Sequence, residues 1–269
     1  MPEGHVIHRL ADELTATFAG RPVRVTSPQG RFAQAAEILD GSVLTSAEAW
    51  GKHLFVGFGE QLVHIHLGLI GKLRWVPPGP ITSPETLRLR ISDAVSAVEL
   101  RGPQTCDLIT SAERDSLAAA LGPDPLRPDA DEGRGWARVA ASNRPIADLL
   151  MDQRVAAGVG NIYRCEVLFR AGLHPDVPGN RLSREQWLQL WDDLVALMPA
   201  GVRDGRIDTV REAESPEVTG RPPRVDRHGG EVYVYRRGGD DCLVCGRGIA
   251  VRTLAGRKLY WCESCQPQR

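Results

Sequence analysis

The stretch 242–265, CLVCGRGIAVRTLAGRKLYWCESC, carries two Cys-x2-Cys pairs that are 16 residues apart. Each pair brings two thiolates within reach of one metal ion, and two pairs complete a tetrahedral shell that leaves no position for water. The four thiols are those of Cys242, Cys245, Cys262 and Cys265. They predict one structural Zn2+ ion, because disulfides, the alternative, rarely form in the cytoplasm.

The residues between the two pairs, IAVRTLAGRKLYW (249–261), form two short β-like runs with Gly256 at the tip. We therefore expect a zinc-held hairpin. It would present Arg257 and Lys258 for contact with phosphate or for insertion into a groove.

The region before the hairpin has the pattern of helices. Ser183 and Gln186 form a capping box, which predicts a helix that begins there. NIYRCEVLFRAG (161–172) predicts a second helix, and Pro145 favours the start of a third. In AAGVGNIY (156–163), the glycines would let a phosphate approach the N-terminus of the following helix. Residues 204–241 show little apolar periodicity and predict a mobile loop.

The first 110 residues have a different pattern. Apolar residues recur at three- and four-residue spacing over 3–19, which predicts a helix. Short alternating runs follow, such as QLVHIHLG (61–68) and TLRLRIS (86–92), and they predict a β-sandwich or barrel-like sheet. The Pro-, Gly- and Asp-rich segment 121–135 is the candidate boundary between the two regions.

The composition of the 269 residues is that of a globular protein, with 42% hydrophobic and 25% charged residues. No apolar run approaches the roughly 20 residues of a membrane span, and no signal-peptide core is present, so we expect a cytoplasmic protein without membrane contact. The net charge is −1, but residues 220–269 hold ten Lys or Arg against five acidic residues. This basic end favours a phosphate-bearing partner, although a solvated tail would give the same count.

The N-terminus begins Met-Pro-Glu. Removal of Met1 would leave Pro2 as a secondary amine. Reference α-amino groups have pKa values of about 8, and a helix N-terminus would lower that value. Such an amine can attack a sugar C1′ atom and form a Schiff base, with Glu3 beside it to exchange protons.

Seven motifs of the chain occur in the order found in the family of formamidopyrimidine-DNA glycosylase and endonuclease VIII. They are MPEG (1–4), GKHL (51–54), HLGLIG (66–71), LGPDPL (121–126), LLMDQRVAAGVGNIYRCE (149–166), VYVYRRGGDDC (232–242) and AGRKLYWCESC (255–265). The chain thus resembles this family from end to end. MPEGH and GRKLYWC are most similar to the endonuclease VIII branch in its actinobacterial form.

The resemblance implies a role for each matching residue. Pro2 would be the nucleophile, and Glu3 the acid that protonates the opening sugar. Lys52 would contact phosphate and assist the chemistry, and Leu69 would fill the gap left by the flipped base. The phosphate-binding positions would be His66, Asn161 and Arg257, of which Arg257 also counts among the catalytic residues.

The resemblance also implies an α+β fold and an activity. We expect an N-terminal helix and β-sandwich domain over 1–125, a linker over 126–135, a helix–two-turn–helix domain over 136–230 and a zinc-finger hairpin over 231–269. The implied activity is that of a bifunctional DNA glycosylase and AP lyase of base excision repair, and because nothing in the sequence suggests a larger assembly, we expect a monomer. It would cut damaged DNA by β,δ-elimination.

Three departures from the family pattern bear on the lesion. Most relatives carry glutamate at position 6, where this chain has Val6. The Arg-x-Phe of the purine-lesion branch is absent from LRGPQTCDL (100–108). The Gln-Leu-Tyr wedge of the other branch is also absent, since Gly68, Leu69 and Ile70 stand there. We expect oxidised bases as substrates, with pyrimidines favoured because the features of the endonuclease VIII branch are more numerous. A formamidopyrimidine or 8-oxoguanine glycosylase of the same family and a non-catalytic nucleic-acid-binding protein are the alternatives.

Overall fold

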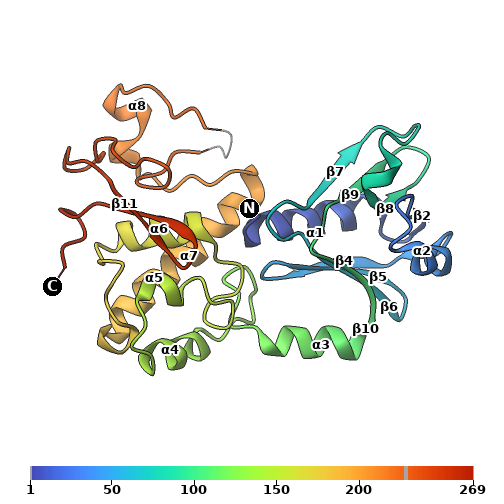
Figure 1. The fold of residues 1–269 in the computed structure, drawn as a ribbon, viewed down its shortest axis with the longest axis horizontal. Helices are drawn as coiled ribbons and strands as arrows, with labels where there is room; N and C mark the ends of the chain where they lie inside the picture. The colour runs from blue at the N-terminus through green and yellow to red at the C-terminus, as the bar shows by residue number, and fades with distance from the viewer. Residues whose placement is uncertain (1, 227–229, 269) are drawn as a thin grey trace. The chain divides into compact units, whose positions relative to one another are not determined.

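The structure, a computed structural model, describes residues 2–226 and 230–268. The chain divides into two compact units, the first ending at Ala120 and the second beginning at Leu121 (Figure 1). The first is built mainly of sheets and the second mainly of helices, which confirms the predicted α+β class. No helix within the described ranges has the length and apolar character needed to cross a membrane.

Helix α1 (Gly4–Phe18) opens the first unit. Its buried stripe includes Ile7, Leu10, Leu14 and Phe18, whose spacing matches the turn of an α-helix. Gly20 follows with φ of 76°, a left-handed conformation that glycine adopts without strain. The helix predicted over 3–19 is confirmed.

Two four-stranded antiparallel sheets share the core of the first unit with α1. The first sheet contains β4 (Ser46–Trp50), β5 (His53–Phe58), β6 (Gln61–His66) and β10 (Thr105–Thr110) in the order β10-β6-β5-β4. The second contains β2 (Arg24–Thr26), β7 (Lys72–Val76), β8 (Leu87–Ser92) and β9 (Ala97–Arg101) in the order β2-β8-β9-β7. The remaining elements are β1 (Arg21–Pro22), β3 (Val43–Leu44), α2 (Ala33–Leu39), α3 (Ser111–Ala120) and the 3-10 turn η1 (Pro84–Thr86).

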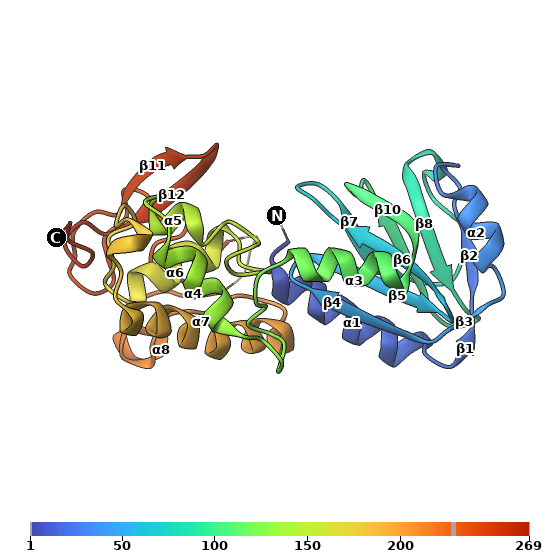
Figure 2. The ribbon, with the colours of Figure 1, turned by 90° about the horizontal axis from the view of Figure 1, so that it is seen from below.

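The two faces of the first sheet differ in character. One face contributes Leu54, Val56 and Ile65 to the apolar core. The other face carries His53 and His64, which alternate with those residues along β5 and β6. Helix α3 lies over this second face (Figure 2), and its Arg114 forms an ion pair with Glu48 of β4.

The second unit is a cluster of helices followed by a β-hairpin. Its elements are α4 (Glu132–Ala140), α5 (Ile146–Leu149), α6 (Asn161–Arg170), α7 (Arg184–Asp204), α8 (Pro216–Thr219), the 3-10 turns η2 (Gly179–Arg181) and η3 (Glu212–Glu214), β11 (Ala250–Leu254) and β12 (Arg257–Trp261). The capping box of Ser183 and Gln186 is present at the start of α7, as predicted. The last four residues of the predicted linker, 132–135, belong to α4. The separation of a helical domain from a zinc hairpin stays a prediction.

Glu166 of α6 is completely buried and binds a distant part of the chain. Its carboxylate accepts hydrogen bonds from the backbone N–H groups of Tyr233 (2.7 Å), Val234 (2.9 Å) and Tyr235 (2.8 Å). The hydroxyl of Thr209 donates a fourth bond of 2.5 Å. A buried carboxylate is tolerated only when such donors compensate its lost hydration.

This network corrects one expectation from the sequence. The segment 204–241 was predicted to be a mobile loop, but Ile207, Thr209 and residues 232–234 are buried. Thr209, Tyr233 and Val234 bind Glu166, and Ile207 and Val232 pack in the apolar core of the unit. The local periodicity of the segment carries no information about these distant partners. Residues 227–229 of the predicted loop lie outside the described residues.

We expect Glu166→Gln to destabilise the protein by about 3 kcal/mol. The amide would turn an N–H toward donors that need an acceptor, and each unsatisfied buried donor costs about 1–3 kcal/mol. Urea unfolding measures the change, with Glu212→Gln as the control because Glu212 is exposed on the neighbouring segment. Equal urea midpoints for the Glu166 variant and the wild type would contradict this account of the fold.

Candidate functional site

Pro2 and Glu3 lie at the start of α1. Glu3 is the residue before the first helical turn, with φ of −109° and ψ of 173°, and only 2% of its surface is exposed. Pro2 is half-buried. The buried residue Glu3 and its neighbour in the chain, Pro2, therefore lie at the end of α1 where the helix dipole is positive.

Lys52 lies in a two-residue turn between β4 and β5. Trp50 pairs with His53 across the turn, and Gly51 has φ of 59°. A left-handed first residue is the requirement of a type II′ turn, which is why glycine precedes the lysine. The turn brings Lys52 close enough to His53 and His66 for its charge to lower the pKa of both rings.

The histidines at this end of the sheet are neutral near pH 7. Burial is the main cause that lowers the pKa of His53 to about 4, followed by the proximity of His66, His64 and Lys52. Burial also lowers the pKa values of His64 and His66. His5 on α1 has a pKa of about 4 because of burial, with His8 as a second cause.

The turn 67–71, LGLIG, exposes two apolar side chains. Leu69 is 68% exposed and Ile70 is 78% exposed. Gly68 has φ of 66°, and the N–H of Gly71 donates to the carbonyl of Leu67 over 3.0 Å. A Cβ atom on Gly71 would lie 2.2 Å from that carbonyl oxygen, so the tight turn needs glycine there. The turn thus presents Leu69, the predicted wedge, together with Ile70.

The second unit brings Asn161 and the hairpin together. Asn161 is the first residue of α6, and its side-chain amide donates to the carbonyl of Lys258 over 2.9 Å. The buried guanidinium of Arg164 contacts both the side chain of Asn161 and that carbonyl. Arg257, the neighbour of Lys258, is the first residue of β12. Two predicted phosphate-binding residues, which are distant in sequence, therefore lie at one place in this unit.

The predicted hairpin is present as β11 and β12. Ala255 and Gly256 connect them, with φ values of 47° and 74°. Two left-handed residues make a type I′ turn, whose twist matches that of the strands. Lys258 is exposed, and Arg257 is half-buried.

The four cysteines at the base of the hairpin converge. All four sulfur atoms lie within 4.8 Å of one another. The Sγ atoms of Cys242 and Cys265 are 3.8 Å apart, and those of Cys245 and Cys262 are 3.5 Å apart. A tetrahedron with metal–sulfur bonds near 2.3 Å has edges of about 3.8 Å. The four thiols therefore fit a single metal ion.

Two residues whose side chains contact these elements were not singled out from the sequence. Gln153 holds the turn before α6, because it accepts from the N–H of Gly158 and donates to the carbonyls of Met151 and Val159. His64 contacts His53, and its place in the alternation of QLVHIHLG was the available signal. The neighbouring sequence could not predict the role of Gln153, because its side-chain hydrogen bonds depend on the conformation of the turn.

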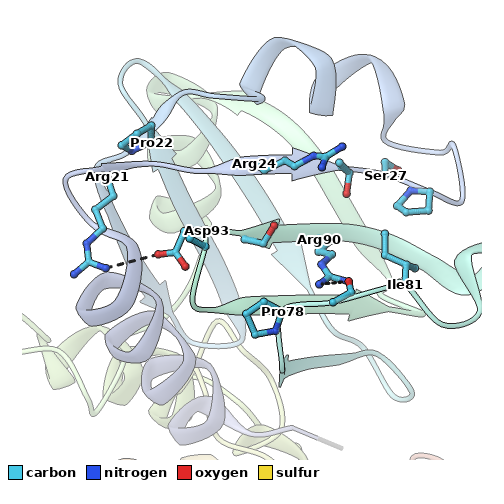
Figure 3. A pocket seen from close by; sticks show the side chains of 13 residues that line it. Arg21, Pro22, Arg24, Ser27, Pro78, Ile81, Arg90 and Asp93 are labelled. Carbon is cyan, nitrogen blue, oxygen red and sulfur yellow. Dashed lines mark hydrogen bonds and ion pairs between the residues drawn. The ribbon is translucent and has the colours of Figure 1, made fainter.

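A separate pocket of about 920 Å³ lies on the second sheet of the first unit (Figure 3). Arg21, near the C-terminal end of α1, lines it and forms a 3.7 Å ion pair with Asp93. Arg90 also lines it but donates to the carbonyl of Gly79 over 3.1 Å. None of the site residues predicted from the sequence lines this pocket, so it is not part of the candidate site.

Known protein families match most of the chain. Residues 1–105 match the formamidopyrimidine-DNA glycosylase N-terminal domain, and residues 121–212 match the formamidopyrimidine-DNA glycosylase H2TH domain. H2TH is the helix–two-turn–helix element.

Curated relatives cover almost all of the sequence. Endonuclease 8 1 of Mycobacterium tuberculosis is 46% identical over 271 residues, which is 99% of this chain and 100% of the relative. Formamidopyrimidine-DNA glycosylase of Methylococcus capsulatus is 34% identical over 91% of this chain and 90% of its own length.

Solved structures agree with these matches. Lactococcus lactis Fpg, in a complex with DNA that contains N7-benzyl-Fapy-dG, aligns with a TM-score of 0.79 at 25% identity. The alignment covers 99% of this chain and 100% of that protein. Together with the two domain matches and the full-length relatives, this places the chain in the formamidopyrimidine-DNA glycosylase and endonuclease VIII family.

Proposed function

We propose that this protein is a bifunctional DNA glycosylase and AP lyase of base excision repair that removes oxidised bases, with pyrimidines favoured. The observation that carries the proposal is the buried carboxylate of Glu3 beside Pro2, at the start of a chain that belongs to this family. The damaged strand of DNA is the substrate. A monomeric state and a cytoplasmic location stay predictions.

The reaction uses the nitrogen of Pro2 after Met1 has been removed. The nitrogen attacks C1′ of the damaged nucleotide, the bond from C1′ to the base breaks, and the base leaves. Loss of the nitrogen's proton and opening of the sugar ring give an iminium ion. Removal of a C2′ proton then breaks the C3′–O bond, and a second elimination breaks the C5′–O bond.

Glu3 is the proton donor and acceptor in this scheme. It protonates the ring oxygen as the sugar opens, which is the role of a positioned general acid. Its burial excludes water from the carboxylate, and its place before α1 keeps it next to the amine. Lys52 and His66 contribute from the sheet, where they hold the phosphate next to the damaged nucleotide.

Asn161 and Arg257 hold the DNA backbone in the second unit. The hydrogen bond from Asn161 to the carbonyl of Lys258 supports this proposal, because it fixes the N-terminus of α6 against the hairpin. Backbone N–H groups at a helix N-terminus and a guanidinium are both suited to phosphate oxygens. The positive charge of Arg257 stabilises the negative charge on the phosphate group as the C–O bond to it breaks.

Leu69 fills the space from which the damaged base is flipped. An exposed aliphatic side chain on a tight turn is suited to this task, because it can enter the stack without losing hydrogen bonds. Unstacking costs a few kcal/mol and least for a damaged pair. Ile70 lies beside Leu69 and enlarges the apolar wedge.

Zn2+ is the metal that best suits the four cysteines. Four thiolates leave no position for a water molecule, so the ion would be structural and would hold the base of the hairpin. Without it, no bond would join the two cysteine pairs, and the turn with Arg257 and Lys258 would lose its anchor.

The protein is expected to form a covalent adduct with DNA when borohydride reduces the iminium ion. Protein whose intact mass shows the loss of Met1 should be trapped on an abasic site, and Pro2→Gly should reduce trapping at least tenfold. Gel electrophoresis measures the adduct. Full trapping by Pro2→Gly would refute the role of Pro2, and DNA binding without any adduct from the wild type would favour the non-catalytic alternative.

Lesion preference is expected to follow the pyrimidine branch. Release of thymine glycol from a duplex should be at least tenfold faster than release of 8-oxoguanine, because the Arg-x-Phe of the purine branch is absent. Single-turnover rates on matched duplexes measure the ratio. The reverse ratio would establish the purine-lesion alternative.

Metal analysis is expected to give one zinc ion per chain. Cys262→Ser should lower the zinc content and weaken the binding of DNA, because the hairpin would lose one of its four ligands. Cys106→Ser is the matched control, since Cys106 lies outside the cluster, on β10 of the first unit. Retention of one tightly bound zinc ion by Cys262→Ser would contradict the assignment.

A further inference from the structure

A stack of aromatic rings lies on the α3 side of the first sheet. His53 pairs with His66, and Phe55 pairs with His64, across strands β5 and β6. The ring centroids are 5.1 Å apart between His53 and His64, 4.9 Å between His53 and His66 and 5.0 Å between Phe55 and His64. Phe55 is buried but does not belong to the apolar core of the unit, so these rings form a packing layer of their own.

One hydrogen bond fixes the middle of this stack. Nδ1 of His53 and Nε2 of His64 are 2.9 Å apart. A neutral imidazole has one N–H group and one acceptor nitrogen, so the bond requires one ring to donate and the other to accept. It therefore couples the tautomers and the orientations of the two rings.

His66, at the end of the stack, depends on this packing. Its Nδ1 atom is buried and has no hydrogen-bond partner among the described residues. A hydrogen bond that its ring donates to the side chain of Gln104 and the contact with the ring of His53 orient it. His53 is also the first residue of β5, directly after Lys52 and the two-residue turn, so a rotation of His53 would disturb both neighbours.

The charged groups around the stack are compatible with neutral rings. Lys52 lies at one end, and Asp107 of β10 pairs with His64. Glu48 of β4 pairs with Phe55 and is neutralised by Arg114 of α3. Burial lowers the pKa of each histidine, which leaves the stack uncharged next to the lysine.

From this arrangement we infer that His64 and His53 are positioning residues for the grip of Lys52 and His66 on the DNA backbone. His64 acts through the hydrogen bond to His53, and His53 acts through its contact with His66 and its place beside Lys52. The inference rests on the proposed function, which assigns phosphate contact to Lys52 and His66.

The test is the affinity of His64→Phe for a short duplex that contains a tetrahydrofuran abasic-site analogue. Phenylalanine keeps the ring packing but removes the hydrogen bond to His53. We expect about tenfold weaker binding, the effect of displacing one charge-assisted contact. The slope of log K against log salt should fall by about one unit, because a phosphate contact by Lys52 is lost. His64→Gln should recover most of the affinity, because its amide reaches the position of Nε2.

Phe55→Leu is the matched control for packing. It should lower the urea midpoint while leaving the salt slope unchanged, because it does not remove the hydrogen bond between the histidines. His53→Phe removes the same bond from the other side and should reproduce the slope change.

Wild-type affinity and slope in the His64→Phe and His53→Phe variants would overturn the inference. Weaker binding by all three variants with an unchanged slope would also overturn it, because the role would then be structural only. If the wild type itself does not bind the analogue, the proposed function fails, and the inference fails with it.

Discussion

The carboxylate of Glu166 determines how the second unit is assembled. A buried negative charge loses its hydration, and in this protein four hydrogen bonds replace that hydration. Three of the donors are consecutive backbone N–H groups, at residues 233–235. A segment without regular secondary structure therefore has a single conformation at this point. That conformation leads directly into Arg236–Asp241 and the first cysteine pair, so the base of the hairpin begins from a fixed position.

In the first unit, backbone turns that require glycine determine where Lys52 and Leu69 lie. Gly51 determines the turn that carries Lys52, and Gly68 and Gly71 determine the turn that exposes Leu69. At these positions the sequence is informative, because a left-handed φ or a close backbone approach excludes other residues. Lys52 and Leu69 lie directly beside these glycines, which places both side chains on short turns.

Sequence periodicity therefore recovered the elements whose signals are local. The stripe of α1, the capping box of α7 and the spacing of the cysteines all depend on residues a few positions apart. It failed at Thr209 and residues 233–235, because their partner Glu166 lies 43 to 69 positions away in the sequence. The sequence predicted only part of the histidine stack. Alternation placed His64 and His66 on one face, but only the register of β5 and β6 shows that His53 joins them.

The basic C-terminal segment illustrates why composition is a weak guide to DNA contact. Several of its arginines form ion pairs within the unit, as Arg221 does with Glu231 and Arg224 with Asp226. These ion pairs stabilise the segment before the hairpin. They also neutralise arginines that a count of basic residues would assign to phosphate binding. Lys258 of the hairpin has an exposed side chain, and its backbone carbonyl accepts a hydrogen bond from Asn161 at the N-terminus of α6. A chain of net charge −1 can thus bind DNA, because the positions of a few cationic side chains matter more for phosphate contact than the net charge of the whole chain.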